Sequence, residues 1–150
     1  MKIAIGCDQN AYELKMGIIK HLEEKGIEVV DYGSNEGEVV LYPDVALKVA
    51  QEVADKKFDR AILICGTGIG MAISANKVPG VRAAQCHDVY SAERARKSND
   101  AQIMTMGAEV IGIQLAKSLV DAWIASEFQG GRSAPKVQRM IEIDEMFNKK

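Results

Sequence analysis

The sequence has no apolar run long enough to span a bilayer, for which a helix needs about 20 consecutive residues, and it has almost no excess charge. Its 19 Lys and Arg residues face 21 Asp and Glu residues, which gives a formal net charge of −2. A protein that binds nucleic acid by neutralising phosphates needs a basic surface, so this balance argues against that class. The first residues enter an apolar strand pattern directly, without the hydrophobic region of a signal peptide. We therefore expect a cytoplasmic protein that binds neither membrane nor nucleic acid.

Cysteine is also scarce. The three cysteines lie at positions 7, 65 and 86, and an odd, scattered set fits reduced thiols better than a disulfide framework. No two of them have the C-x₂₋₄-C spacing that structural zinc sites usually show. This argues against a metal centre built from the thiols, His87 and nearby aspartates.

At 150 residues the chain has the length of one domain, residues 1–150, and no linker-like stretch or internal repeat divides it. Short apolar segments predict strands at residues 2–5, 27–30, 60–64, 81–84 and 102–105. Amphipathic segments predict helices at residues 12–25, 43–55, 71–76, 91–97, 113–126 and 134–146. Strands that are separated by helices form a parallel sheet with both faces covered, so the sequence predicts an α/β fold.

In such folds the ligand lies at the carboxyl ends of the strands. Three groups of polar or thiol residues lie just past expected strands, at positions 7–8, 65–66 and 86–88. We expect these groups to crowd the same edge of the sheet. Asn99 and Asp100 come instead just before the fifth strand.

The most informative segment is the loop after the third strand, Cys65-Gly66-Thr67-Gly68-Ile69-Gly70. Glycines at alternate positions let backbone N–H groups turn inward as a cavity for an anion, and the helix that follows adds positive potential. The same potential is expected to lower the pKa of Cys65, which places a candidate base beside an oxyanion cradle. The alternative is that Cys65 is a small buried hydrophobe, the usual role of a free cysteine.

Two nucleotide-binding motifs are not matched by this loop. Met71 stands where a dinucleotide-binding motif requires its third glycine, and the loop follows the third strand rather than the first. No Gly-Lys-Ser/Thr follows the glycines, so the loop is not a P-loop.

Arg132 and Lys136 are one helical turn apart near the start of the last expected helix, where they could clamp an anionic group. The alternative is a solvated helix start. Residues 8–10, Asp-Gln-Asn, have their own alternative as an N-cap of the first helix. We expect His21 to be exposed on the polar side of that helix. Four methionines are interpreted as core residues, namely Met71, Met104, Met106 and Met140.

Together these segments resemble the type B ribose-5-phosphate isomerases, whose relatives include the paired subunits of galactose-6-phosphate isomerase. The resemblance covers nearly the whole chain. It is carried by Gly6-Cys7-Asp8, Glu13-Leu14-Lys15, Tyr42-Pro43-Asp44, Cys65 to Gly70, Ala75-Asn76-Lys77, Gly80-Val81-Arg82-Ala83-Ala84, Ser98-Asn99-Asp100-Ala101 and Gly130-Gly131-Arg132. It implies a Rossmann-like, three-layer α/β/α sandwich with a five-stranded parallel sheet. It also implies a homodimer or homotetramer whose active sites are shared between subunits.

The resemblance implies an aldose–ketose isomerase that moves a proton between C1 and C2 of a sugar phosphate through an enediolate. Cys65 would be the catalytic base, and Thr67 would contribute its hydroxyl. No metal or organic cofactor is implied, because a base and an oxyanion hole suffice. The residues that would bind the substrate through the loop backbone, the sugar hydroxyls and the phosphate are Asp8, Gln9, Gly66, Gly68, Ile69, Gly70, Asn99, Arg132 and Lys136.

The sequence departs from the family pattern at several positions. Gln9 stands where a histidine is usual, Ser98 replaces the histidine credited with opening the sugar ring, and Glu109 stands where an arginine is usual. Ser133 and Lys136 replace a histidine and a second arginine after the Gly-Gly-Arg motif.

Serine cannot act as a general acid near neutral pH as imidazole does. We therefore expect an isomerase of ribose 5-phosphate and ribulose 5-phosphate, or of a related, shorter sugar phosphate that needs no ring opening. The alternatives are a subunit of a hetero-oligomeric sugar-phosphate isomerase and a non-catalytic sugar-phosphate-binding protein.

Overall fold

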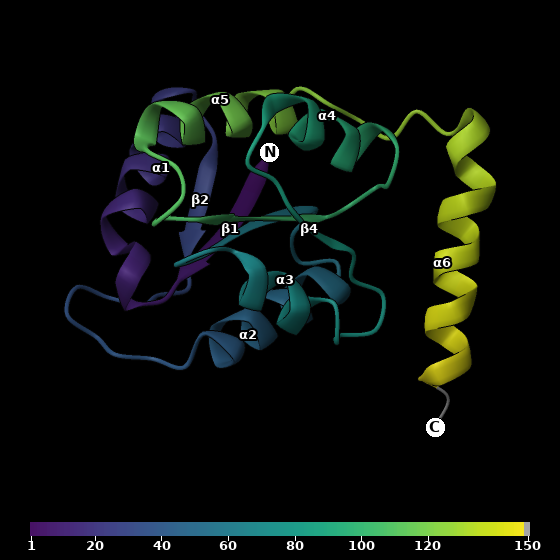
Figure 1. Ribbon diagram of the computed structural model, residues 1–150, viewed down its shortest axis with the longest axis horizontal. Helices are drawn as coiled ribbons and strands as arrows, with labels where there is room; N and C mark the ends of the chain where they lie inside the picture. Colours follow the sequence, from purple (N-terminus) through teal and green to yellow (C-terminus); the bar gives the residue numbers. More distant parts are fainter. Residues whose placement is uncertain (149–150) are drawn as a thin grey trace.

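The computed structural model describes residues 1–148 as a parallel sheet between layers of helices (Figure 1). The strands are β1 (Lys2–Cys7), β2 (Glu28–Asp31), β3 (Arg60–Cys65), β4 (Ala83–Gln85) and β5 (Ile103–Gly107), in the spatial order β2-β1-β3-β5-β4. The helices are α1 (Tyr12–Glu24), α2 (Tyr42–Ala54), α3 (Ile69–Ala75), α4 (Val89–Lys97), α5 (Ile113–Ile124) and α6 (Ala134–Phe147), with short 3₁₀ turns η1 (Gln9–Ala11) and η2 (Gly131–Ser133). All strand pairs are parallel, which confirms the predicted α/β fold. Every expected strand and helix is present, with ends at most two residues from those predicted.

Two apolar cores lie on opposite faces of the sheet, because alternate residues of a strand point to opposite sides. On β3, Ile62 and Ile64 belong to the core that is covered by α1, α4 and α5. Ala61 and Leu63 belong to the core on the other face, under α2 and α3. Because β3 is buried along its whole length, it holds its last residue, Cys65, on a rigid support.

Two packing expectations are wrong. Three of the four methionines expected in the core are fully buried, but Met140 on α6 is 39% exposed. His21 is not exposed on α1, because its Nε2 lies 2.7 Å from Asp121 Oδ1 of α5 and 15% of its side chain is accessible. Both errors have the same cause. The apolar pattern of one helix does not show which distant segments of the chain pack against it.

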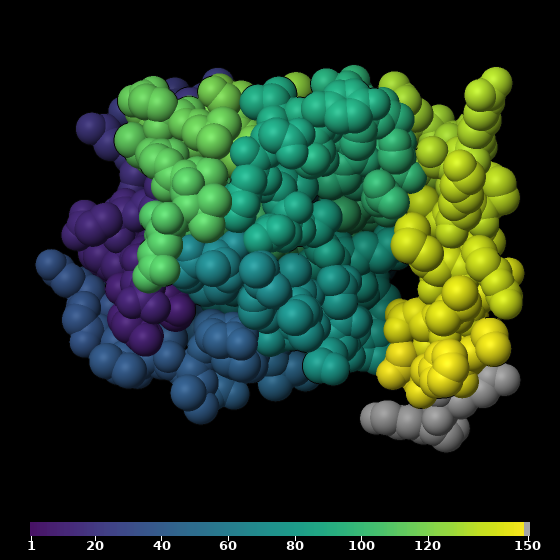
Figure 2. Space-filling view, in the orientation of Figure 1, coloured from purple at the N-terminus to yellow at the C-terminus, as the bar shows by residue number. Residues whose placement is uncertain are grey.

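The last helix, α6, stands at one side of the molecule instead of covering the sheet, and Figure 2 shows it as a yellow ridge beside the body. Val137 is its only buried residue within the described part of the chain. Asp144 Oδ2 accepts a hydrogen bond from the Gly80 N–H at 2.6 Å, which ties α6 to the loop before β4. Met146 and Phe147 remain largely exposed at its end. Among residues 1–148 there is no helix of the length and apolarity needed to cross a membrane.

Candidate active site

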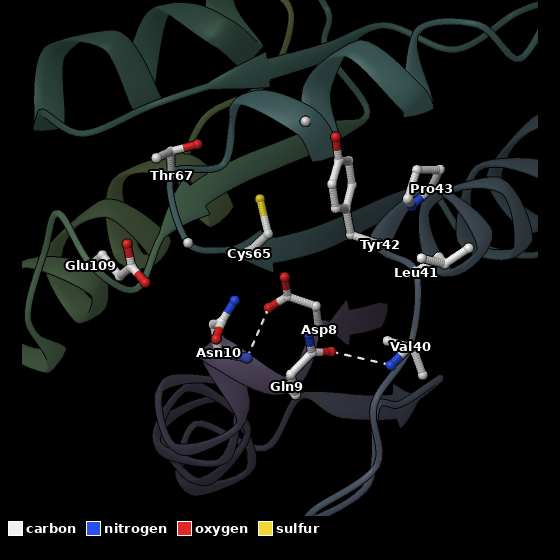
Figure 3. A pocket seen from close by; sticks show the side chains of 12 residues that line it. Asp8, Gln9, Asn10, Val40, Leu41, Tyr42, Pro43, Cys65, Thr67 and Glu109 are labelled. Carbon is white, nitrogen blue, oxygen red and sulfur yellow. Dashed lines mark hydrogen bonds between the residues drawn. The ribbon is translucent and has the colours of Figure 1, made fainter.

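A pocket of about 530 Å³ opens at the carboxyl edge of the sheet, beside the ends of β1 and β3 (Figure 3). The chain leaves β1 toward α1 on one face of the sheet and leaves β3 toward α3 on the other. The two loops therefore diverge and leave a crevice between them, the usual ligand position in such sheets. The pocket is lined by Asp8, Gln9, Asn10, Val40, Leu41, Tyr42, Pro43, Cys65, Gly66, Thr67, Gly70 and Glu109.

Asp8 caps the 3₁₀ turn η1 that precedes α1, instead of α1 itself, and it also lines the pocket. Its Oδ1 accepts a hydrogen bond from the Asn10 N–H at 3.0 Å. Gln9 Oε1 accepts a hydrogen bond from the Val40 N–H at 3.1 Å. This bond fastens the segment before α2 against the turn after β1, as Figure 3 shows. Both side chains are therefore held by hydrogen bonds at the edge of the crevice, Asp8 within its own turn and Gln9 across to the segment before α2.

Cys65 lines the pocket from a position where only 4% of the residue is exposed. Its Sγ accepts a hydrogen bond from the Gly68 N–H at 3.2 Å. The loop takes this shape because Gly68 adopts a φ of +78°, and a Cβ there would lie 2.8–2.9 Å from backbone atoms of Met106. Any side chain at position 68 would push the loop away from β5 and withdraw the donor from the thiol.

Three backbone N–H groups of the same loop have no acceptor. Gly66, Thr67 and Gly70 line the pocket, and no hydrogen bond within residues 1–148 uses their N–H groups. The Ile69 N–H is occupied, because it donates to Thr67 Oγ1 at 3.2 Å. Gly70 lies in the first turn of α3, where N–H groups lack partners inside the helix. The three donors form a cradle suited to a negatively charged oxygen beside the thiol.

Tyr42 forms an apolar wall of the pocket. It is the first residue of α2, and a Cβ on Gly70 would overlap its ring. The missing side chain at position 70 therefore lets α2 and α3 approach each other. Leu41 and Pro43 extend the same wall, as Figure 3 shows.

The pocket carries two carboxylates and, within residues 1–148, no cationic lining residue. Glu109 follows β5, its N–H donates to the Gly66 carbonyl at 3.0 Å, and its carboxyl group lies 3.4–3.6 Å from where a Gly66 Cβ would be. Burial raises the pKa of Asp8, and the charge of Glu109 raises it further against the opposing effect of the bonds with Asn10. No group of three or more His, Cys, Asp or Glu side chains in the described chain is placed to hold a metal ion. The charged side chains of the pocket, within residues 1–148, are therefore negative. Its positive potential comes from the partial charges of backbone N–H groups.

Several of the predicted binding residues do not line this pocket. Asn99 is exposed beyond the end of α4, near the amino end of β5 and thus at the opposite edge of the sheet. Arg132 and Lys136 are exposed at η2 and at the start of α6. Gly68 and Ile69 belong to the glycine loop but do not face the cavity. The pocket of one chain thus joins Asp8, Gln9, Cys65, Gly66, Thr67 and Gly70, and leaves the expected cations outside.

The residues after β4 support the loops instead of lining the pocket. His87 Nε2 accepts a hydrogen bond from the Gly107 N–H at 2.9 Å, and Asp88 caps α4 by accepting one from the Ser91 N–H at 2.7 Å. Cys86 is buried, which raises the pKa of its thiol to about 11. Cys7 is fully buried and does not line the pocket either, so Cys65 is the only one of the three thiols that faces it.

Asn10, Tyr42 and Glu109 also line the pocket, although they are not among the binding and catalytic residues that the sequence predicts. Asn10 and Glu109 each come soon after the carboxyl end of a strand, so the rule that predicts Asp8 and Cys65 applies to them too. Tyr42 carries no such signal, because its place depends on the packing of α2 against α3.

Comparison with known proteins gives one consistent family. The model of the Ribose/Galactose Isomerase family matches residues 3–140. The Ribose-5-P isomerase B of Listeria innocua is 66% identical over 97% of this chain and 98% of its own length. The D-erythrulose-4-phosphate isomerase of Pectobacterium atrosepticum is 55% identical over 93% of each chain. The solved structure of Clostridium thermocellum ribose-5-phosphate isomerase B is 48% identical, with a TM-score of 0.96 over 99% of this chain and 100% of that one.

Proposed function

The chain belongs to the ribose/galactose isomerase family, and from that premise we propose that it interconverts the aldose and ketose forms of a tetrose 4-phosphate. It is an intramolecular isomerase of the ribose-5-phosphate isomerase B type. Two substrates occur in the names of its relatives, ribose 5-phosphate for the Listeria innocua protein and D-erythrulose 4-phosphate for the Pectobacterium atrosepticum protein. Ser98 favours the shorter of the two.

Cys65 is the base in this proposal. As a thiolate it takes the proton from C2 of the open-chain aldose, and the electron pair forms an enediolate whose negative charge lies on O1. The proton returns to C1, and a second proton moves from O2 to O1, so the ketose forms without gain or loss of atoms. Backbone N–H groups of Gly66, Thr67 and Gly70 stabilise the charged oxygen. The observation that carries the proposal is the Cys65 thiol in one pocket with three N–H donors that have no acceptor.

The phosphate group needs a cation, and residues 1–148 of one chain place none in the pocket. Arg132 and Lys136 are exposed, and guanidinium geometry suits a phosphate. Met140, Met146 and Phe147 on the same helix expose apolar area that nothing in the described chain covers. We therefore expect a homodimer, or a homotetramer of two dimers, in which η2 and α6 of one subunit bring Arg132 and Lys136 to the pocket of the other. Light scattering tests this arrangement, and an active monomer would contradict it.

Ser98 bears on the length of the substrate. Its Oγ accepts a hydrogen bond from Arg94 Nε at 2.7 Å. The adjacent Asn99 lies at the edge of the sheet opposite the pocket of its own chain, so its expected contact with substrate hydroxyls would be made in the pocket of a partner subunit. A hydroxyl cannot replace imidazole as the acid that opens a sugar ring near neutral pH. A tetrose 4-phosphate cannot form the usual phosphate-bearing furanose, so it needs no such acid. The preference of the enzyme is therefore expected to follow the open-chain fraction of each sugar.

A coupled assay of the purified protein with tetrose, pentose and hexose phosphates tests the substrate. We expect a higher kcat/KM for erythrose 4-phosphate than for ribose 5-phosphate. Ser98→His should raise kcat/KM for the pentose and barely change it for the tetrose, because the new imidazole acts only on ring opening. A strong preference for ribose 5-phosphate, unaffected by Ser98→His, would overturn the tetrose assignment. Activity that appears only when a second protein is added would instead identify a subunit of a hetero-oligomeric isomerase.

A further inference from the structure

A second cavity, of about 320 Å³, lies at the amino edge of the sheet, opposite the active-site pocket. Arg60 is the first residue of β3 and Cys65 is the last, so the two edges are about 16 Å apart along this strand. The second cavity, here called the arginine cavity, has no part in the proposed isomerisation. It is lined by Met1, Lys56, Asp59, Arg60, Arg82, Arg96, Asp100, Gln102 and Glu127.

Three guanidinium groups are fixed around the arginine cavity by neutral backbone carbonyls. Arg60 donates to three carbonyl groups at and just after the end of α5, at 2.8–3.0 Å. Arg96 donates to the carbonyl of Ala101 at 2.9 Å, and Arg82 donates to that of Asp100 at 3.1 Å. These bonds set the positions of the guanidinium groups without neutralising their charge.

Among the residues that the structure describes, two carboxylates pair with the three arginines. Asp100 lies 3.3 Å from Arg82 and 3.1 Å from Arg96, and Glu127 contacts both Arg96 and Arg60. The side chains of Arg60 and Arg96 are 3% and 8% exposed, so their charges are poorly solvated. Burial lowers the pKa of Arg60, and the nearby charge of Arg96 lowers it further. The repulsion between two buried positive charges of this kind is reduced when an additional anion binds beside them.

Glu127 marks the place where that anion fits. Its carboxylate contacts Arg60 and Arg96 together, so the two guanidinium groups converge on a space of the size of one carboxylate or phosphate. The Glu127 side chain is 73% exposed, so its carboxylate can move out into solvent, whereas the buried guanidinium groups stay in the cavity. Lys56 and Asp59 carry opposite charges and balance each other, so removing the Glu127 carboxylate from the cavity leaves an excess of two positive charges.

We propose that the arginine cavity binds a small phosphate-bearing anion, either inorganic phosphate or a phosphate monoester. The anion displaces the Glu127 carboxylate and is held by Arg60, Arg82 and Arg96. Phosphate is favoured over a carboxylate because its several oxygens can accept from three separate guanidinium groups. This site is distinct from the active-site pocket, and it stands whether or not the tetrose assignment is correct.

The arginine cavity is placed to influence the active site of a partner subunit. Asp100 is held by Arg82 and Arg96, and it directly follows Asn99, the residue expected to bind substrate hydroxyls in the partner. An anion that competes for these two arginines loosens the support of Asp100. Occupancy of the cavity is therefore expected to change KM through Asn99.

Trp123 provides a signal for this cavity alone. It is the only tryptophan of the chain, and its ring centroid lies 5.5 Å from the Arg60 guanidinium carbon. Titration with inorganic phosphate and with glycerol 3-phosphate, at constant ionic strength, should give a saturable change in Trp123 fluorescence. Tighter binding of the monoester would identify a phosphorylated metabolite as the ligand, and equal or weaker binding would identify free phosphate.

Two variants at the exposed side of the cavity test the binding residues. Arg82→Gln removes one charged donor and should weaken binding about fivefold or more. Glu127→Gln removes the competing carboxylate and should strengthen binding about threefold. Thermal unfolding of each variant shows whether it is folded, and phosphate should raise the Tm of the parent protein more than that of Arg82→Gln.

Two further variants separate this cavity from the active site. Arg132→Gln removes the cation expected to bind substrate phosphate, and Arg139→Gln removes an exposed charge on α6. Both should leave the fluorescence titration unchanged. The proposal is overturned if phosphate produces no saturable change, or if Arg132→Gln abolishes the change while Arg82→Gln does not.

Discussion

The two cavities lie at opposite edges of one sheet and have opposite charge. Within residues 1–148, the active-site pocket at the carboxyl edge is lined by two carboxylates and no cationic side chain, whereas the arginine cavity at the amino edge is lined by three arginines. The direction of the helices explains the difference. α3 begins at the carboxyl edge and presents N–H groups there, whereas α5 ends near the amino edge and presents carbonyl groups that hold Arg60.

This polarity shows where each part of the proposed chemistry obtains its positive charge. In the proposal the enediolate is stabilised by backbone N–H groups, which are fixed by the fold and need no side chain. The substrate phosphate needs guanidinium or ammonium groups, and we propose that these come from η2 and α6 of a partner subunit, outside the sheet. On this proposal the reaction and the binding of phosphate depend on different parts of the molecule, which mutations can separate.

The largest expected effect is on the reaction at the carboxyl edge. Cys65→Ser should lower kcat at least about 10²-fold, because a hydroxyl of similar size is a much poorer base under the same conditions. Cys86→Ser is the matched control, because that thiol is buried away from the pocket and should have little effect on kcat. Steady-state kinetics with the preferred sugar phosphate measure both. Near-normal turnover of Cys65→Ser would rule out the thiol as the base.

The next effect is on binding rather than on the reaction. Arg132→Gln should raise KM about tenfold, the loss expected for one charged contact to a phosphate, while kcat changes much less. Arg139→Gln removes a comparable exposed charge from α6 and should leave KM unchanged. If both variants behaved alike, Arg132 would not bind the phosphate. The proposal that side-chain cations bind the phosphate while backbone N–H groups stabilise the enediolate would then fail.

The sequence predicts the fold and the meeting of Cys65 and Asp8 in one pocket because both depend on local patterns. Cys65 and Asp8 lie just past the apolar strands expected from the sequence, and the strand-end rule places them together without knowledge of any distant contact. The sequence marks Arg60 only as the start of a strand, because its bonds to the end of α5 join residues more than 60 positions apart. The core position predicted for Met140 is wrong for a related reason, since α6 packs against little of its own chain. Contacts between distant segments, or between subunits, leave no periodic signal.

A smaller effect is expected from the charge of Glu109. Glu109→Gln should lower KM about threefold, because its carboxylate repels the substrate phosphate across a solvated pocket. Glu109→Arg should lower KM further for longer sugar phosphates that reach this side of the pocket. Glu23→Gln, an exposed residue of α1, is the matched control and should have no effect. Added salt should reduce the difference between Glu109→Gln and the parent enzyme, since screening weakens the same repulsion. A difference that does not depend on salt would assign Glu109 a contact with the substrate instead.

The smallest expected effect concerns the stability cost of an anionic pocket. Burial and then Glu109 raise the pKa of Asp8, so the folded state favours the protonated carboxyl group. Its stabilising contribution is fully present below the pKa of the unfolded chain and is lost as the pH rises through the raised pKa of the folded state. At pH 7, which is above the pKa of the unfolded chain, the preference of the fold for the neutral carboxyl group therefore lowers stability relative to acid pH. Asp8→Asn keeps an oxygen that can cap η1 and removes the charge, so its Tm should exceed that of the parent at pH 7. The gain should be no more than about 2–4 °C, the shift that about 1 kcal/mol produces in a chain of this size.

The difference should vanish near pH 3, where Asp8 is neutral in both states of the parent. Thermal unfolding across this pH range measures it, with the exposed Asp55→Asn as the matched carboxylate control. A Tm for Asp8→Asn below that of the parent at pH 7, with no difference near pH 3, would mean that the ionised carboxylate stabilises the pocket.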